Sequence, residues 1–166
     1  MGKTQLALEF VHRYRDSFDV VLWANADDHS KLAQDFNTMA LELGLVPRDS
    51  IDAKDQIQTR EIVKRWLVDP LKDLTSNVSE KASWLLIFDG VGEPSVLNTF
   101  WPYDGPGSIL ITSKNPFEWT TSFQLVSFTV AEATRYLLQV TKRNTQDSQE
   151  DVQGVSEKLG GLPLAL

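Results

Sequence analysis

Gly2, Lys3 and Thr4 match the end of the phosphate-binding loop GxxxxGK[ST]. In that loop, backbone amides cradle the phosphates, the lysine reaches the outer phosphates, and the hydroxyl holds a magnesium ion. Leu6 and Phe10 follow with helical spacing, which places Thr4 in the first turn of a helix. Unpaired amides and the positive end of the helix dipole favour an anion there. The tripeptide therefore predicts phosphate binding, with a plain surface helix as the alternative.

A carboxylate, Asp89, ends the most continuous apolar run of the chain, residues 84–88, and is followed by Gly90. Such a run is typical of a buried strand. Because ligands gather at the carboxyl ends of parallel strands, we expect Asp89 and Thr4 to face the same crevice. Magnesium takes oxygen ligands, usually one or two carboxylates completed by phosphates and water. Thr4 and Asp89 are therefore predicted magnesium ligands; the alternative is that Asp89 caps the turn after a core strand.

Two further polar segments are expected near this rim. Thr112 and Lys114 lie at the end of the next apolar run, where they would bring a hydroxyl and a cation to a terminal phosphate. A solvated lysine in a polar loop is an equally good interpretation of Lys114. Asp27 and Asp28 follow an earlier strand, where they either approach the ligand or open the next helix at its favourable dipole end.

Four apolar or β-branched runs are predicted strands, and the stretches between them have mostly helical spacing. The predicted strands are residues 18–24, 84–89, 108–113 and 123–128. A helix is expected over residues 130–142, and the polar residues 144–150 are expected to form a loop. Strands separated by helices predict an α/β fold with a parallel sheet covered on both faces.

The composition excludes several classes of function. The net charge is −7 and the isoelectric point about 4.8, so the surface repels nucleic-acid phosphates, and we expect no nucleic-acid partner. The absence of cysteine excludes disulfides and thiolate chemistry and fits a reducing compartment. No apolar run approaches the roughly 20 residues that a membrane-spanning helix needs. We therefore expect a cytoplasmic protein without a membrane segment.

Four segments, GKTQLALEF, WLLIFDGV, GSILITSKN and GLPLAL, occur in this order through nearly the whole chain. Their order and approximate spacing resemble the NB-ARC nucleotide-binding module of STAND-class, NLR-type proteins, most closely those of filamentous fungi. This module belongs to the P-loop NTPase superfamily. Four motifs in order are a stronger indication than any one of them.

The resemblance implies an ADP/ATP switch, closed with ADP, open and homo-oligomeric with ATP, and reset by at most weak ATP hydrolysis. Asp89 matches the Walker B aspartate, which is associated with magnesium and is the candidate catalytic residue. The residues that the resemblance assigns to the nucleotide are Gly2, Lys3, Thr4, Gln5, Thr112, Lys114 and Pro163. The last of these would lie near the adenine base.

The resemblance also implies a domain arrangement and a context. Residues 1–144 would form part of the nucleotide-binding domain, and residues 145–166 would begin the helical ARC subdomain. Contacts with other domains of a parent protein and a role in signalling, such as innate immunity, follow from the same resemblance. The chain is then a fragment, truncated at both ends, which lacks the first central strand of the sheet and which we expect to fold poorly alone.

Two positions depart from the family pattern. Gly90 stands where an acidic or amide residue usually follows the Walker B aspartate, so vigorous hydrolysis is not expected. Lys114 stands where arginine is usual and lacks the planar, bidentate guanidinium. Two alternatives to a switch stay open. One is a nucleotide-free module of the same fold that binds a protein partner, and the other is a P-loop enzyme such as a kinase or helicase-type ATPase.

Overall fold

The computed structural model describes residues 2–72, 80–115, 119, 121–142 and 146–160. The chain divides into two compact units, residues 4–117 and residues 118–166, and the first three residues group with the second. The elements up to residue 117 are α1 (Lys3–Tyr14), β1 (Val20–Asn25), α2 (His29–Glu42), α3 (Gln56–Val68), β2 (Trp84–Val91) and β3 (Ser108–Ser113), with the short 3-10 turns η1 (Arg15–Ser17), η2 (Asp52–Lys54) and η3 (Pro94–Leu97). The later elements are α4 (Val130–Thr141) and α5 (Gln146–Lys158).

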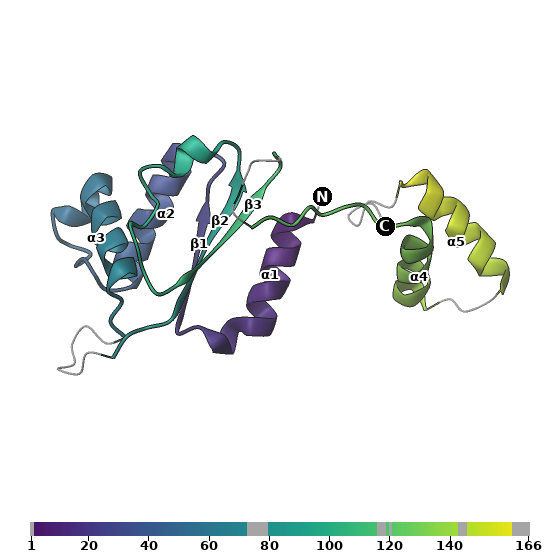
Figure 1. The fold of residues 1–166 in the computed structure, drawn as a ribbon, viewed down its shortest axis with the longest axis horizontal. Coiled ribbons are helices and arrows are strands. Elements are labelled where there is room, and N and C mark those ends of the chain that lie inside the picture. Colours follow the sequence, from purple (N-terminus) through teal and green to yellow (C-terminus); the bar gives the residue numbers. More distant parts are fainter. Residues whose placement is uncertain (1, 73–79, 116–118, 120, 143–145, 161–166) are drawn as a thin grey trace. The chain divides into compact units, whose positions relative to one another are not determined.

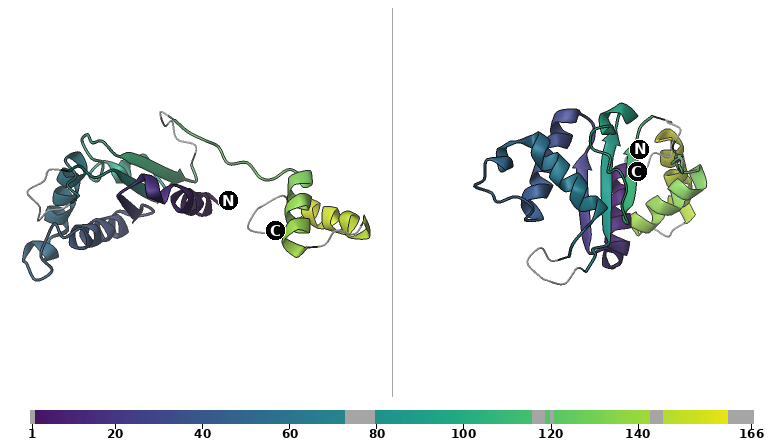
Figure 2. Two further views of the ribbon diagram at one scale, coloured as in Figure 1. Left: turned by 90° about the horizontal axis from the view of Figure 1, so that it is seen from below. Right: turned by 60° about the vertical axis from the view of Figure 1, so that its left-hand side comes forward.

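The three strands form an open, all-parallel sheet in the order β1-β2-β3 (Figures 1 and 2). β1 and β2 pair as far as Asn25 opposite Asp89. The register of β2 and β3 shifts between Phe88 and Val91. Because parallel strands end at the same edge of a sheet, the residues at the carboxyl ends of β1, β2 and β3 lie together at this edge. A parallel sheet flanked by helices confirms the predicted α/β class and is consistent with a P-loop-like fold.

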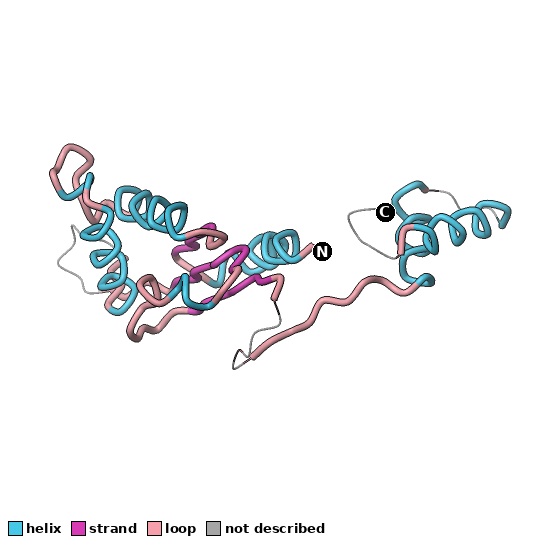
Figure 3. The backbone as a smooth tube through the Cα atoms, turned by 90° about the horizontal axis from the view of Figure 1, so that it is seen from above, coloured by secondary structure: helices cyan, strands magenta, loops and turns pink. Residues whose placement is uncertain are grey.

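Helices α2 and α3 lie on one side of the sheet and α1 on the other (Figures 1 and 3). The apolar stripe of α2 is buried against the sheet, where the ring of Phe36 stacks on that of Phe88 with centroids 6.2 Å apart. The carboxylate of Asp28 begins α2 by accepting hydrogen bonds from the amides of Ser30 and Lys31. The largest fully buried side chains are Trp84, Phe36, Phe88, Phe100, Leu32, Leu67, Leu85, Leu86 and Ile87.

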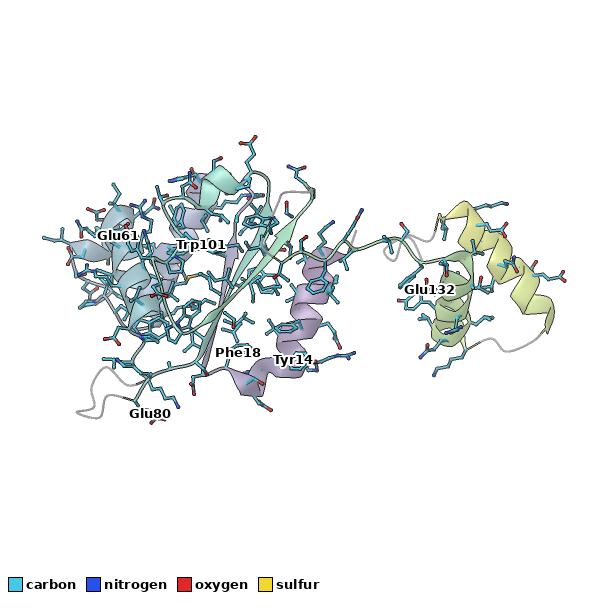
Figure 4. The ribbon with its side chains drawn as sticks, viewed as in Figure 1. Tyr14, Phe18, Glu61, Glu80, Trp101 and Glu132 are labelled. Carbon is cyan, nitrogen blue, oxygen red and sulfur yellow. The ribbon has the colours of Figure 1, made fainter. Side chains whose placement is uncertain are left out.

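Helix α1 buries much less apolar surface than α2. Ala7 is its one buried residue, while the larger side chains Leu6 and Tyr14 are 54% and 51% exposed. Figure 4 shows Tyr14 near the end of α1, and its ring lies 4.8 Å from that of Phe10 on the preceding turn. With so little apolar contact, the polar interactions at the start of α1 matter more for its position.

The start of β3 is shaped around a tryptophan. Trp84 is 2% exposed, and its indole Nε1 donates to the carbonyl of Leu67 at 3.0 Å. A β-carbon on Gly107 would lie 2.0 Å from the Trp84 ring, so the backbone approaches the ring more closely than any side chain permits. The glycine-rich segment before β3 therefore provides the space in which Trp84 packs.

The predicted strand over residues 123–128 is wrong. The structure has no strand there, and Phe123 and Val126 are 87% and 78% exposed. The segment belongs to the compact unit 118–166, in which the structure describes no strand. A β-branched and aromatic run becomes a strand only when a neighbouring strand pairs with its backbone, and no described strand pairs with this one.

The second unit is a pair of helices. α4 begins at a capping box, in which Thr129 and Glu132 bond to each other's backbone amides; Figure 4 shows Glu132 at this end of α4. α5 begins at Gln146, so the predicted loop over 144–150 is wrong from residue 146 onward. The buried hydroxyls of Thr134 and Ser156 meet at 3.3 Å and join the two helices.

The division into units differs from the domain boundary expected at residue 144. The compact units separate after residue 117, so α4 groups with α5.

None of the helices in the described part of the chain is both long and apolar enough to cross a lipid bilayer.

Candidate functional site

The hydroxyl of Thr4 lies on the carboxylate of Asp89, although the two residues are 85 positions apart. Thr4 is the second residue of α1, and Asp89 lies near the carboxyl end of β2. Thr4 Oγ1 is 2.9 Å from Oδ1 and 3.0 Å from Oδ2 of Asp89, so its proton is shared between both oxygens. The start of a helix and the end of a parallel strand therefore meet at the edge of the sheet where the sequence predicts a ligand.

A second hydroxyl fixes the carboxylate from β3. Thr112, 7% exposed, donates to Asp89 Oδ1 at 2.5 Å and accepts a hydrogen bond from the amide of Gly90 at 2.9 Å. The direction of this chain is determined, because an amide can only donate and the hydroxyl has one proton to give. Gly90 has a φ of +81°, a conformation that favours glycine, and the following register shift turns its amide toward β3. Thr112 thus orients Asp89.

The start of α1 carries the residues predicted to bind phosphate. Gly2 precedes the helix with a φ of +90°, and Lys3 is its first residue. The first turn contains no acidic side chain, so the amides and dipole at this end are not already neutralised by a carboxylate of the helix itself. Gln5 is exposed to solvent. This end of α1 is therefore chemically suited to an anion.

The segment after β3 is tied to the segment after β2. Ser113 Oγ donates to the carbonyl of Val91 at 2.7 Å, and the Asn115 side-chain amide donates to the carbonyl of Gly92 at 2.5 Å. Lys114, between them, is exposed, and no ion pair of this lysine is found among the described residues. The backbone holding Lys114 is thus fixed while its ammonium group stays in solvent.

The end of β1 supplies two neighbouring carboxylates with different surroundings. Asp28 caps α2, and hydrogen bonds from the amides of Lys31 and Ser30 lower its pKa below the ordinary value. Asp27 instead pairs with the ammonium of Lys31 at 2.8 Å. The hydrogen bond and charge of Asp27 raise the pKa of Lys31, with a smaller effect from Asp28. From sequence, this acidic pair could either approach the ligand or begin the next helix. The structure shows that Asp28 caps the helix.

Asp27 lies beside Gly90. The amide of Ala26 donates to the carbonyl of Asp89 at 2.7 Å, which continues the β1–β2 pairing to the residue before Asp27. The Cβ of Asp27 is 3.8 Å from the place that a β-carbon on Gly90 would take. Asp27 is therefore the residue at this edge that sequence reasoning undervalued, and its only signal was an acidic pair directly after a strand.

The donor atoms gathered here suit a hard cation that is shared with a ligand. Thr4 and Asp89 offer hydroxyl and carboxylate oxygens, which magnesium prefers. Within the described ranges, no three histidine, cysteine or acidic residues are grouped so as to hold a metal by themselves. An ion at this edge would need phosphate or water oxygens to complete its shell. Pro163, predicted to lie near an adenine base, is outside the residues that the structure describes.

Comparison with known proteins gives no match for this chain, whether against protein-family models, curated protein sequences or solved structures. The candidate site accordingly rests on its own geometry. The site consists of the start of α1, the Asp89 carboxylate near the end of β2, and the hydroxyls of Thr4 and Thr112. These hydroxyls donate hydrogen bonds to the carboxylate from α1 and β3.

Proposed function

We propose that the chain binds a magnesium complex of ADP or ATP at the edge of the sheet formed by Thr4, Asp89 and the start of α1. The observation that carries the proposal is the hydrogen bond of the Thr4 hydroxyl to both carboxylate oxygens of Asp89. The sequence motifs predict both residues as magnesium ligands. Their meeting across 85 residues is the result expected of a nucleotide site at the carboxyl end of a parallel strand.

Each residue has a distinct part in this proposal. Lys3 would neutralise the outer phosphates, and the amides at the start of α1 would bind phosphate oxygens. Thr4 and Asp89 would hold the magnesium ion, which supplies charge neutralisation to the phosphates when bound. Thr112 keeps the Asp89 carboxylate in place, and Lys114 is free in solvent to approach a terminal phosphate.

We further propose that the site serves a switch of the NB-ARC type, in a cytoplasmic signalling protein. The four sequence motifs and the parallel sheet support this, since the motif residues Thr4, Asp89 and Thr112 converge at one edge. ATP hydrolysis would be slow at most, because Gly90 carries no side chain beside Asp89. Other domains of a parent protein and further copies of the chain in its ATP state would be the partners.

A nucleotide-free protein-binding module is the second candidate. It is favoured by the exposed apolar side chains of α1, among them Leu6, Leu8 and Tyr14. It is also compatible with the Thr4–Asp89 hydrogen bond, which satisfies both polar groups without an ion. The two candidates differ in one property, the affinity for nucleotide.

Calorimetric titration of the chain with magnesium and ADP tests the proposal. We expect binding in the wild-type chain and a loss of at least about tenfold in affinity in Lys3→Ala, because a charge-assisted contact contributes about 1.5–3 kcal/mol. Lys54→Ala, which removes an exposed lysine of η2, is the matched control and should bind like the wild type. Equal losses in both variants, or none in Lys3→Ala, would show that Lys3 does not bind phosphate.

A further inference from the structure

Both oxygens of the Asp89 carboxylate are already engaged by hydroxyl groups. Oδ1 accepts hydrogen bonds from Thr4 and Thr112, and Oδ2 accepts from Thr4. In the proposed function these oxygens also face the metal ion. Phosphoryl transfer to water requires a separate group that orients the nucleophile in line with the bond that breaks. Asp89 is therefore not that group.

Gly90 does not supply the missing group either. It has no side chain, and its amide is occupied by Thr112 Oγ1 at 2.9 Å. Its φ of +81° also disfavours any other residue at this position. The group must come from another element at the same edge of the sheet.

Asp27 is the carboxylate placed there. It directly follows Ala26, whose amide bonds to the Asp89 carbonyl, and its Cβ is 3.8 Å from where a side chain on Gly90 would start. Of the neighbouring acids, Asp28 is engaged by the amides of α2, and Asp35 accepts from the Asn25 amide at 2.7 Å. The ammonium of Lys31 binds one oxygen of Asp27, Oδ2, at 2.8 Å, and the Asp27 side chain is 48% exposed.

We propose that Asp27 orients the attacking water in a slow hydrolysis of ATP at this site, an inference that rests on the proposed function. The water oxygen forms a bond to the γ-phosphorus, and the bond between this phosphorus and the bridging oxygen breaks. The electron pair of that bond leaves on ADP, and the water proton passes to Asp27 and then to solvent. The products are ADP and inorganic phosphate. An acid from the segment after β1 thereby orients the water, a role for which β2 has no side chain at position 90.

The test is phosphate release from ATP by the full chain with magnesium, measured together with ADP affinity. Asp27→Asn keeps the shape of the side chain and removes its charge; we expect turnover to fall at least about tenfold, as for loss of a general base. ADP affinity should change less than threefold, since Asp27 is not assigned to the phosphates. Asp16→Asn removes an exposed carboxylate from η1 and should leave both quantities unchanged.

The outcomes separate the two claims. If Asp27→Asn binds nucleotide and hydrolyses ATP as fast as the wild type, the role of Asp27 is overturned and the proposed function stays intact. The same holds if the wild type binds nucleotide but shows no measurable turnover. Absence of nucleotide binding in the folded wild-type chain overturns the proposed function and the role of Asp27 with it. Asp27→Glu retains a carboxylate, and partial turnover in this variant is the further expected result.

Discussion

Thr112 illustrates how a single hydroxyl sets the geometry of the candidate site. It accepts from the Gly90 amide and donates to Asp89, so removing it leaves the Gly90 amide without this acceptor and the Asp89 carboxylate with Thr4 as its remaining hydroxyl donor. The hydroxyl is buried, and water does not readily replace it. Its effect on stability is therefore larger than that of an exposed threonine.

We expect Thr112→Val to lower the free energy of unfolding by about 1–3 kcal/mol, because the valine fills the same space but makes neither hydrogen bond. Chemical denaturation measures the change. Thr112→Ser keeps the hydroxyl and should cost less than Thr112→Val, so equal losses in the two variants would contradict the hydrogen-bonding role.

Of the contacts at the candidate site, the one between Thr4 and Asp89 was predictable, because each residue belongs to a recognisable sequence motif. Thr4 and Asp89 were expected to face one crevice from strand and helix polarity, and they are in contact. Thr112 was expected to face a phosphate, whereas its hydroxyl is directed to Asp89. That contact depends on the register shift after Phe88, which leaves no recognisable pattern in the sequence. The place of Asp27 beside Gly90 depends instead on the register of β1 and β2, which no motif in the sequence defines.

At the scale of elements, the start of α2 depends on one carboxylate. Amide hydrogen bonds lower the pKa of Asp28 below its ordinary value of 3.8. A group with a lowered folded-state pKa stabilises the fold at pH values above its unfolded pKa, and this contribution disappears as the pH falls through the folded pKa. The start of α2 should therefore weaken in acid.

Asp28→Asn provides the comparison, because asparagine also caps helices but carries no charge. We expect the wild type to be more stable than Asp28→Asn at pH 6 and this difference to shrink as the pH is lowered below about 3.8. Denaturant unfolding at a series of pH values gives the difference in the free energy of unfolding between the two chains. The other carboxylates are present in both chains, so their titration cancels in this difference. A difference that does not vary with pH would refute the role of the ionised cap.

The close approach of β3 to Trp84 is a second property of an element. Gly107→Ala places a methyl group in the Trp84 ring and should destabilise the fold by about 1–3 kcal/mol, as overpacking of a core does. Gly92→Ala, at a position with nothing within 4 Å of the new methyl group, should be tolerated. Thermal melts of the two variants compare them, and a stable Gly107→Ala chain would mean that Trp84 is free to move.

The strands of the sheet were predictable because they are continuous apolar runs, and two other elements were not. Residues 123–128 have strand composition but no strand beside them in the described structure. Residues 146–150 are polar, yet they belong to α5. Polar composition does not oppose a helix whose other residues pack against a neighbour, as Ser156 does against α4.

At the scale of the whole molecule, the apolar core is concentrated in residues 4–117. Among the described residues, the largest fully buried side chains lie there, whereas the buried residues found in α4 and α5 are Ala133, Thr134 and Ser156. Amides of a well-packed core open only with global unfolding, and those of sparsely packed segments open at lower free energy. Hydrogen exchange should therefore be slowest in the central strand β2 and fastest in α4 and α5. Equal protection of β2 and α4 would contradict this distribution of stability.

The central claim is that Thr4 and Asp89 form the magnesium part of a nucleotide site, and the dependence of ADP affinity on magnesium tests it most directly. Calorimetry on the folded chain, with magnesium or with EDTA, should give tighter ADP binding with magnesium in the wild type. In Asp89→Asn the affinity should be weaker and nearly insensitive to magnesium, since a carboxylate ligand is lost. No ADP binding by the folded wild type, or the same magnesium dependence in both chains, would contradict the claim.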